Sequence, residues 1–187
     1  MRRIRHVPVL VLALSGILPS GRMPGAAKAS REYLVYFGTY TDKGSKGIYA
    51  CRFRPATGKL TPVELAAETV NPSFLAVDSV QHYLFAANEI GDYRNAKSGS
   101  VSSFAIDRRS AKLIPLNTVA SRGADPCHLT VDKTGKHVLV ANYTGGSAAV
   151  LPVKADGTLG ESSDFVQHLG SAWIPTGNTN RMPTMWC

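Results

Sequence analysis

The sequence predicts an all-β fold in which four-stranded antiparallel units are arranged as the blades of a β-propeller. Three observations favour it. A 21-residue segment recurs at a constant offset, each copy divides into four short strand-like stretches, and helical periodicity is absent outside the N-terminal segment. A β-sandwich is the alternative architecture, but it would not explain a constant offset.

The repeat is visible by direct alignment. Residues 71–91, NPSFLAVDSVQHYLFAANEIG, align without gaps with residues 125–145, DPCHLTVDKTGKHVLVANYTG, at an offset of 54. Seven of the 21 positions are identical. A partial copy precedes them, because LVYFGT at 34–39 aligns with LFAANE at 84–89. The sequence therefore predicts an incomplete propeller with two full blades and a three-stranded one.

Each full unit is expected to form four strands. In the first unit they cover residues 74–78, 83–89, 100–107 and 113–121, and in the second unit residues 128–132, 137–143, 147–153 and 159–167. The partial unit begins at its second strand, residues 33–39, and lacks an innermost strand. Second strands such as 138–141, VLVA, are apolar on both sides, which predicts that both faces are covered. Cys51 lies on an alternating strand and is expected to be a buried thiol.

Residues 1–29 have the pattern of an export signal. Three arginines precede an apolar stretch at 7–18, and Ala27-Lys28-Ala29 is an A-x-A cleavage site that would leave Ser30 as the new N-terminus. This predicts a periplasmic or secreted protein with no membrane attachment after cleavage, and an uncleaved anchor is the alternative. The net charge of +8 falls to +3 without the five cations of the first 30 residues, so nucleic-acid binding is not predicted.

The predicted domain organisation is a signal peptide at 1–29, a partial propeller at 30–169 and a non-homologous, disordered tail at 170–187. The tail carries no further repeat, and an ordinary disordered C-terminus is the alternative interpretation. A closed ring needs about four to eight blades. We therefore expect a truncated array whose open blade edges and faces promote self-association.

Several strings resemble a known family. They are YFGTYTDKGSKGIY (36–49), NPSFLAVD (71–78), ANEIGDY (87–93), SRGADPCHLTVDKTGKHVLVANYTGGS (121–147) and ADGTLGE (155–161). Over residues 31–169 the chain resembles the seven-bladed propeller lactonases, which include propeller-type 6-phosphogluconolactonases. The resemblance implies hydrolysis of a sugar-acid lactone, such as 6-phosphogluconolactone or a related compound, without a metal or other cofactor. It also implies that the main catalytic His, Arg and Glu belong to later blades, so this chain is expected to lack them.

Loops at one end of the blades are expected to surround the mouth of the central channel. They comprise 71–73 and 122–128 between units, and 39–47, 88–98 and 142–146 within units. Two residues are candidate catalytic groups. By internal repeat Glu89 occupies the place that the resemblance gives to the family's catalytic Glu, but in a different blade, and the alternative is a rim carboxylate paired with Arg94 or Lys97. His128 could act as a base, and the alternative is a hydrogen-bonded structural histidine.

Four further residues are candidate substrate-binding groups, namely Asn88, Arg122, Asn142 and Tyr143. Arg122 could hold an acidic group, although a solvated arginine is the commoner case. Asn88 and Asn142 recur at matched places, which also suits a shared turn role. No cysteine belongs to a C-x-x-C pair, so no metal site is predicted. Besides a lactone hydrolase, a non-catalytic module that binds a ligand or protein and an inactive truncation product stay open.

Overall fold

The computed structural model describes residues 32–169. The regular elements of this part of the chain are β-strands, apart from a single short 3₁₀ turn, η1 (Tyr93–Asn95). The strands are β1 (Tyr33–Phe37), β2 (Gly47–Arg54), β3 (Lys59–Leu60), β4 (Glu64–Glu68), β5 (Pro72–Val77), β6 (Tyr83–Asn88), β7 (Ser100–Ile106), β8 (Leu113–Ala120), β9 (Pro126–Val131), β10 (His137–Asn142), β11 (Ser147–Pro152) and β12 (Asp164–Gln167).

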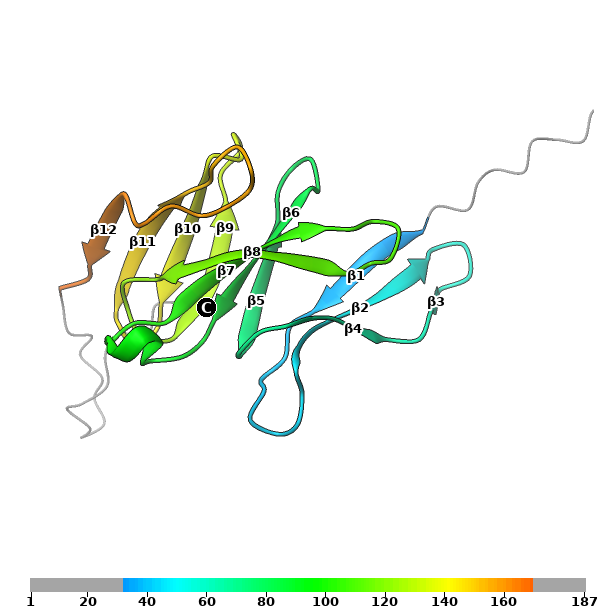
Figure 1. Cartoon of the computed structure of the whole chain (residues 1–187), viewed down its shortest axis with the longest axis horizontal. Coiled ribbons are helices and arrows are strands. Elements are labelled where there is room, and N and C mark those ends of the chain that lie inside the picture. The colour runs from blue at the N-terminus through cyan, green and yellow to red at the C-terminus, as the bar shows by residue number, and fades with distance from the viewer. Residues whose placement is uncertain (1–31, 170–187) are drawn as a thin grey trace, which may run out of the picture.

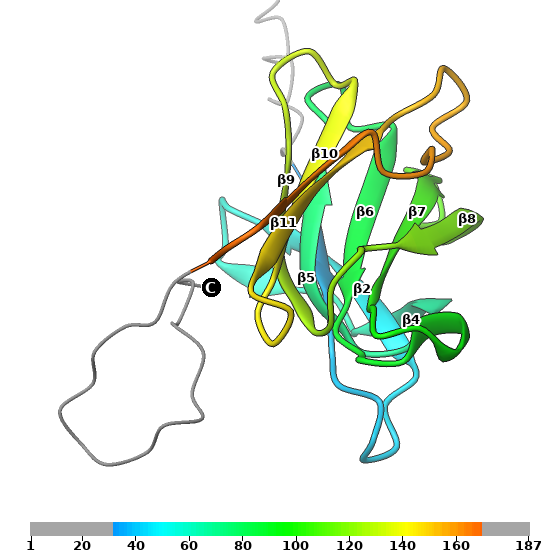
Figure 2. The same cartoon turned by 90° about the vertical axis from the view of Figure 1, so that its left-hand side faces the viewer.

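The strands form three antiparallel sheets, which we call blades 1, 2 and 3 in chain order. Blade 2 has the order β5-β6-β7-β8, and blade 3 has the order β9-β10-β11-β12. The three sheets lie in a row in Figure 1, and Figure 2 looks along the row with blade 3 nearest the viewer. This arrangement confirms the predicted incomplete propeller of four-stranded antiparallel blades.

Blade 1 begins at its second strand, as the repeat alignment predicted. Within residues 32–169, β1 pairs with β2 alone. The outer position beside β2 is shared by two strands, since β3 and β4 both pair with β2. The sheet therefore counts four strands although it fills only three blade positions.

One predicted strand is shorter than expected. Residues 159–167 were expected to be extended throughout, but β12 covers only Asp164–Gln167. Leu159 instead forms an isolated bridge with Val153 and is fully buried. Its N–H donates to Asn117 Oδ1 in blade 2 at 2.8 Å, so this residue belongs to a contact between blades rather than to the outer strand.

The strand β6 is covered on both faces, as its apolar sequence predicted. Leu84 and Ala86 pack in a cluster with blade 1, whereas Phe85 and Ala87 pack in a cluster with blade 3. All four residues are fully buried. The apolar second strand is therefore the layer on which both neighbouring blades close.

The equivalent strand of blade 3 differs. In β10, Val138 and Val140 are buried against blade 2, but Leu139 is 43% exposed. The prediction that both faces are covered is therefore wrong for β10 within residues 32–169, because no described sheet packs on its second face. The same open face exposes Val166 of β12.

The described residues also bear on the thiol at Cys51 and on membrane-spanning helices. Cys51 is a buried free thiol in β2, as its strand pattern predicted. No helix among residues 32–169 is long and apolar enough to cross a membrane. The predicted signal at 1–29 and the predicted tail at 170–187 lie outside the described residues. The domain predicted for 30–169 is described from residue 32 onward.

Candidate functional site

One end of the three blades carries a cavity of about 300 Å³, which we call the mouth cavity. Five side chains line it: Tyr40, Ser73, Glu89, Cys127 and Tyr143. Each comes from a different one of the five segments that the repeat pattern placed at this end, although Ser73 and Cys127 lie at the start of β5 and β9 and not in loops. The site is therefore assembled from all three blades, and two of the predicted site residues, Glu89 and Tyr143, meet in it.

The internal repeat builds four of the five positions. Ser73 and Cys127 are separated by 54 residues, as are Glu89 and Tyr143. Blades 2 and 3 thus present equivalent positions to the same space, filled by different side chains. Tyr40 is the fifth, and it comes from the β1–β2 loop of blade 1.

The backbone beneath these positions also repeats. Asn71 and Asp125, again 54 residues apart, adopt left-handed conformations with φ of 37° and 53°. Their carbonyls accept hydrogen bonds from the N–H groups of Glu89 (2.9 Å) and Tyr143 (2.8 Å). Asn and Asp tolerate positive φ better than other side-chain-bearing residues. The two residues therefore fix where Glu89 and Tyr143 leave the sheet.

Asn71 has a second task, because its side chain reaches into blade 1. Its Oδ1 accepts hydrogen bonds from Thr41 N and Thr41 Oγ1, both at 2.9 Å. Its Nδ2 donates to the Glu89 carbonyl at 3.3 Å. Asn71 thus joins the loop that carries Tyr40 to the residue that carries the carboxylate.

Tyr40 and Glu89 form the polar centre of the cavity. Tyr40 Oη donates to Glu89 Oε2 at 2.9 Å. This hydrogen bond raises the pKa of Tyr40 above its usual value of 10.0, and burial and the carboxylates of Glu89 and Asp125 raise it further. Tyr40 is thus a neutral donor at physiological pH. Among residues 32–169 no cation forms an ion pair with Glu89, so the expected alternative pairing with Arg94 or Lys97 is not formed.

His128, the second catalytic candidate, does not line the mouth cavity. It lies on β9, next to Cys127, and its ring packs on Phe74 of blade 2 with 4.3 Å between the ring centroids. The structure therefore places His128 in the packing between the inner strands of blades 2 and 3.

Three predicted substrate-binding residues also lie away from the cavity. Arg122 is exposed, and its Cζ lies 5.4 Å from the centroid of the Phe165 ring. Asn88 and Asn142 are fully buried. Asn88 Nδ2 donates to Thr69 Oγ1 at 2.8 Å and Asn142 Nδ2 donates to the Ser121 carbonyl at 2.9 Å, so both amides secure the segment that enters their blade.

Sequence reasoning did not single out Tyr40, Ser73 or Cys127. The offset of 54 was the available signal for the pair Ser73 and Cys127, because it links them as it links Glu89 and Tyr143. Tyr40 lies in a loop of a partial unit, where no repeat position marks it. No group of three or more His, Cys, Asp or Glu side chains suited to a metal ion occurs among residues 32–169.

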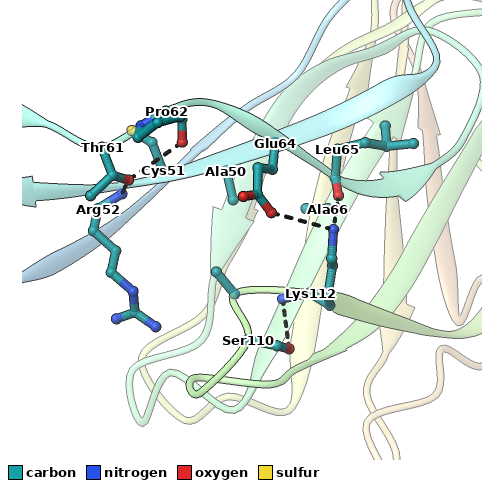
Figure 3. A pocket seen from close by; sticks show the side chains of 11 residues that line it. Ala50, Cys51, Arg52, Thr61, Pro62, Glu64, Leu65, Ala66, Ser110 and Lys112 are labelled. Atoms are coloured by element: carbon teal, nitrogen blue, oxygen red, sulfur yellow. Dashed lines mark hydrogen bonds and ion pairs between the residues drawn. The ribbon is translucent and has the colours of Figure 1, made fainter.

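Two other cavities lie between blades 1 and 2. The small one, of about 100 Å³, is shown in Figure 3, where Lys112 reaches across to blade 1. Lys112 Nζ donates to the Leu65 carbonyl at 2.6 Å and lies 3.9 Å from Glu64 Oε2. The other cavity, of about 520 Å³, is lined by Arg52 and Arg108 among others. Both guanidinium groups donate to backbone carbonyls, so the cations here tie blades and turns together.

The comparisons with known proteins agree with this architecture. Residues 34–183 match the family model described as "Lactonase, 7-bladed beta-propeller". The 6-phosphogluconolactonase of Bacillus subtilis is 34% identical over 139 residues, which are 74% of this chain and 38% of that protein.

Solved structures show the same relationship. A Bacteroides fragilis protein provisionally named 6-phosphogluconolactonase superposes with a TM-score of 0.73 and 36% identity, over 85% of this chain and 42% of that one. The periplasmic gluconolactonase of Pseudomonas aeruginosa superposes with a TM-score of 0.68 and 34% identity, over 74% of this chain and 39% of that one. The chain thus spans about two fifths of the length of its relatives. The repeat, the blades and these matches together show that the chain belongs to the seven-bladed β-propeller lactonase family.

Proposed function

We propose that the protein is a hydrolase that opens a sugar-acid lactone, 6-phosphogluconolactone or a related compound, and that this chain holds only part of the catalytic machinery. The observation that carries the proposal is the mouth cavity, where the β1–β2 and β6–β7 loops of a lactonase-family fold bring Tyr40 and Glu89 together. The names of relatives support the substrate class, since they include a 6-phosphogluconolactonase and a gluconolactonase.

In the proposed reaction a water molecule attacks the lactone carbonyl, and the ring C–O bond breaks to give a hydroxy acid. Glu89 accepts the proton of the attacking water through Oε1, while Tyr40 holds Oε2 and orients the carboxylate. The protonated Glu89 returns this proton to the ring oxygen as it leaves, which regenerates the carboxylate. The family resemblance implies that the main His, Arg and Glu come from later blades, and Glu89 would assist them from the wall formed by blade 2.

The test is hydrolysis of glucono-1,5-lactone by the purified full chain, followed by acid release in a pH-stat. We expect a rate above spontaneous hydrolysis that falls by about 10²-fold when Glu89 is changed to Gln, since a positioned general base contributes about that much. Glu161→Gln, at an exposed carboxylate outside the cavity, is the matched control. A wild-type rate equal to the spontaneous one would show that this chain is a non-catalytic segment.

We also propose export and self-association. Cleavage after Ala29 predicts a mature chain that begins at Ser30, which N-terminal sequencing of the secreted or periplasmic protein would check. The exposed Leu139 and Val166 on the open face of blade 3 support association between copies. Sedimentation velocity should then show a mass that rises with concentration, and a monomer throughout would contradict it.

A further inference from the structure

The mouth cavity has an unbalanced charge. Among its five lining side chains the only charged group is the Glu89 carboxylate. The carboxylate of Asp125 is near enough to raise the pKa of Tyr40, so a second negative charge acts on the same space. A dianionic phosphate placed beside these groups would be repelled, and the repulsion would be strongest at low ionic strength.

Four arginines of the described blades are engaged elsewhere. Arg122 stacks on Phe165, and Arg94 lies over the ring of its neighbour Tyr93 with Cζ 5.1 Å from the centroid. Arg52 and Arg108 bind carbonyls beside the larger cavity, which lies along the N-terminal part of β1 and the β5–β6 turn. Phosphate recognition relies on Arg or Lys donors, and none of these lines the mouth cavity.

Apart from Cys127, the remaining lining groups are hydroxyls and aromatic rings. Tyr40 and Tyr143 combine an apolar ring with a phenolic oxygen. Ser73 contributes a buried hydroxyl oxygen that has no hydrogen-bond partner among residues 32–169. Glu89 Oε1 makes no hydrogen bond within residues 32–169, so it is open to a donor. A ring that carries several hydroxyls supplies donors for the carboxylate and acceptors for Tyr40 and Ser73.

We infer that the mouth cavity is a binding site for the uncharged, hydroxyl-bearing part of a sugar ring and that Glu89 makes it reject a phosphate ester. The inference rests on the proposed function in taking a sugar ring as the ligand. It goes further by naming the neutral ring as the preferred class, Glu89 as the group that determines the preference, and Tyr40 and Ser73 as groups that bind the hydroxyls of the ring.

Binding to the full chain by two probes that cannot be hydrolysed tests the inference. The probes are 1,5-anhydroglucitol and its 6-phosphate, with affinities measured by titration in saturation-transfer NMR at low salt. We expect millimolar binding of the neutral ring and binding of the phosphate ester that is weaker by about fivefold or more, with the difference shrinking as salt is added.

Variants assign the preference to its groups. Glu89→Gln should bring the two affinities to within about twofold, because it removes the charge and keeps the shape. Ser73→Ala should weaken the binding of both probes by about threefold, as expected for one lost neutral hydrogen bond, and should leave the ratio of the two affinities unchanged. Glu161→Gln should change neither value.

Equal or tighter binding of the phosphate ester by the wild-type chain would overturn the inference, as would the absence of saturable binding of the neutral ring in the millimolar range. An unchanged ratio in Glu89→Gln would also overturn it. These results do not depend on hydrolysis. A chain that binds the neutral ring but leaves glucono-1,5-lactone intact would refute the proposed activity and keep the binding site, whereas hydrolysis with a preference for the ester would do the reverse.

Discussion

The two interfaces between the blades are made from the same repeat but are held together differently. Between blades 1 and 2 the buried cluster includes four alanines, namely Ala50, Ala66, Ala67 and Ala86. Polar side chains then bridge its two ends: Lys112 at the outer strands and the Tyr40–Glu89 and Thr41–Asn71 pairs at the mouth. Between blades 2 and 3 the cluster is dominated by large apolar side chains, among them Phe85, Leu129 and Leu151.

The second interface also has side-chain polar contacts at its outer part. Asn117 makes two hydrogen bonds of 2.8 Å with the backbone of Leu159, and Ser103 Oγ donates to the Gly157 carbonyl at 2.6 Å. Stability should therefore depend more on the second interface, while the side chains that set the geometry of the mouth belong to the first.

The largest effect is expected from Phe85→Ala at the second interface. Phe85 is fully buried among residues of blades 2 and 3, so truncation leaves a cavity and should cost about 3–5 kcal/mol of unfolding free energy. Urea unfolding followed by far-UV circular dichroism measures this loss of unfolding free energy. Ile114→Ala, at a position 56% exposed on β8, should cost less than about 1 kcal/mol. Similar losses in the two variants would contradict the packing described here.

A pair of glycines separates a contact between blades from the strain of a turn. Gly157 (φ +82°) and Gly135 (φ +72°) both have left-handed backbones, but a methyl group on Gly157 would overlap the Tyr83 ring, whereas Gly135 faces open space. We expect Gly135→Ala to cost about 1 kcal/mol from backbone strain alone. Gly157→Ala should cost about 1–3 kcal/mol more, because Tyr83 must move. Equal changes in the urea midpoint would show that the contact does not matter.

Two asparagines test the polar ties. Asn117→Ala should lower the unfolding free energy by about 2 kcal/mol, since it removes two hydrogen bonds at the second interface.

Asn71→Gly keeps the left-handed backbone accessible but removes the side-chain hydrogen bonds to Thr41. It should cost less stability and yet let the pKa of Tyr40 fall toward 10.0, which tyrosinate absorbance would record against Tyr40→Phe. An unchanged pKa of Tyr40 in Asn71→Gly would show that Asn71 does not position Tyr40 against Glu89.

The smallest effect should come from acid, and it should not distinguish the interfaces. The pKa values of Asp107, Asp132 and Asp156 are lowered by hydrogen bonds from the side chains of Ser110, Thr134 and Thr158 in exposed hairpin turns. A carboxylate whose pKa is lowered by folding stabilises the protein above its unfolded value of 3.8, and this contribution is lost as the pH falls through and below that value. The urea concentration at the unfolding midpoint should fall when the pH is lowered below about 4, and this fall should be smaller in Asp132→Asn.

Much of the fold could be predicted because a strand's pattern and a repeat are local features of the sequence. The strands of blades 2 and 3 begin and end within a few residues of their expected bounds, and the long β12 was wrong because Leu159 is drawn to Asn117 of another blade. The site residues stay predictions. Among them Glu89 and Tyr143 line the mouth cavity, whereas His128, Arg122, Asn88 and Asn142 do not.

The amino-acid sequence by itself determined that equivalent four-stranded modules follow one another and that Glu89 and Tyr143 occupy matched positions. The offset of 54 is a property of the sequence and does not depend on how the modules pack. Only the tertiary structure decided that Tyr40 meets Glu89, which lies 49 residues further along the chain. That meeting depends on the packing of blade 1 against blade 2 and on the left-handed turn at Asn71. Such contacts join residues distant in the chain, and no periodicity of the sequence records them.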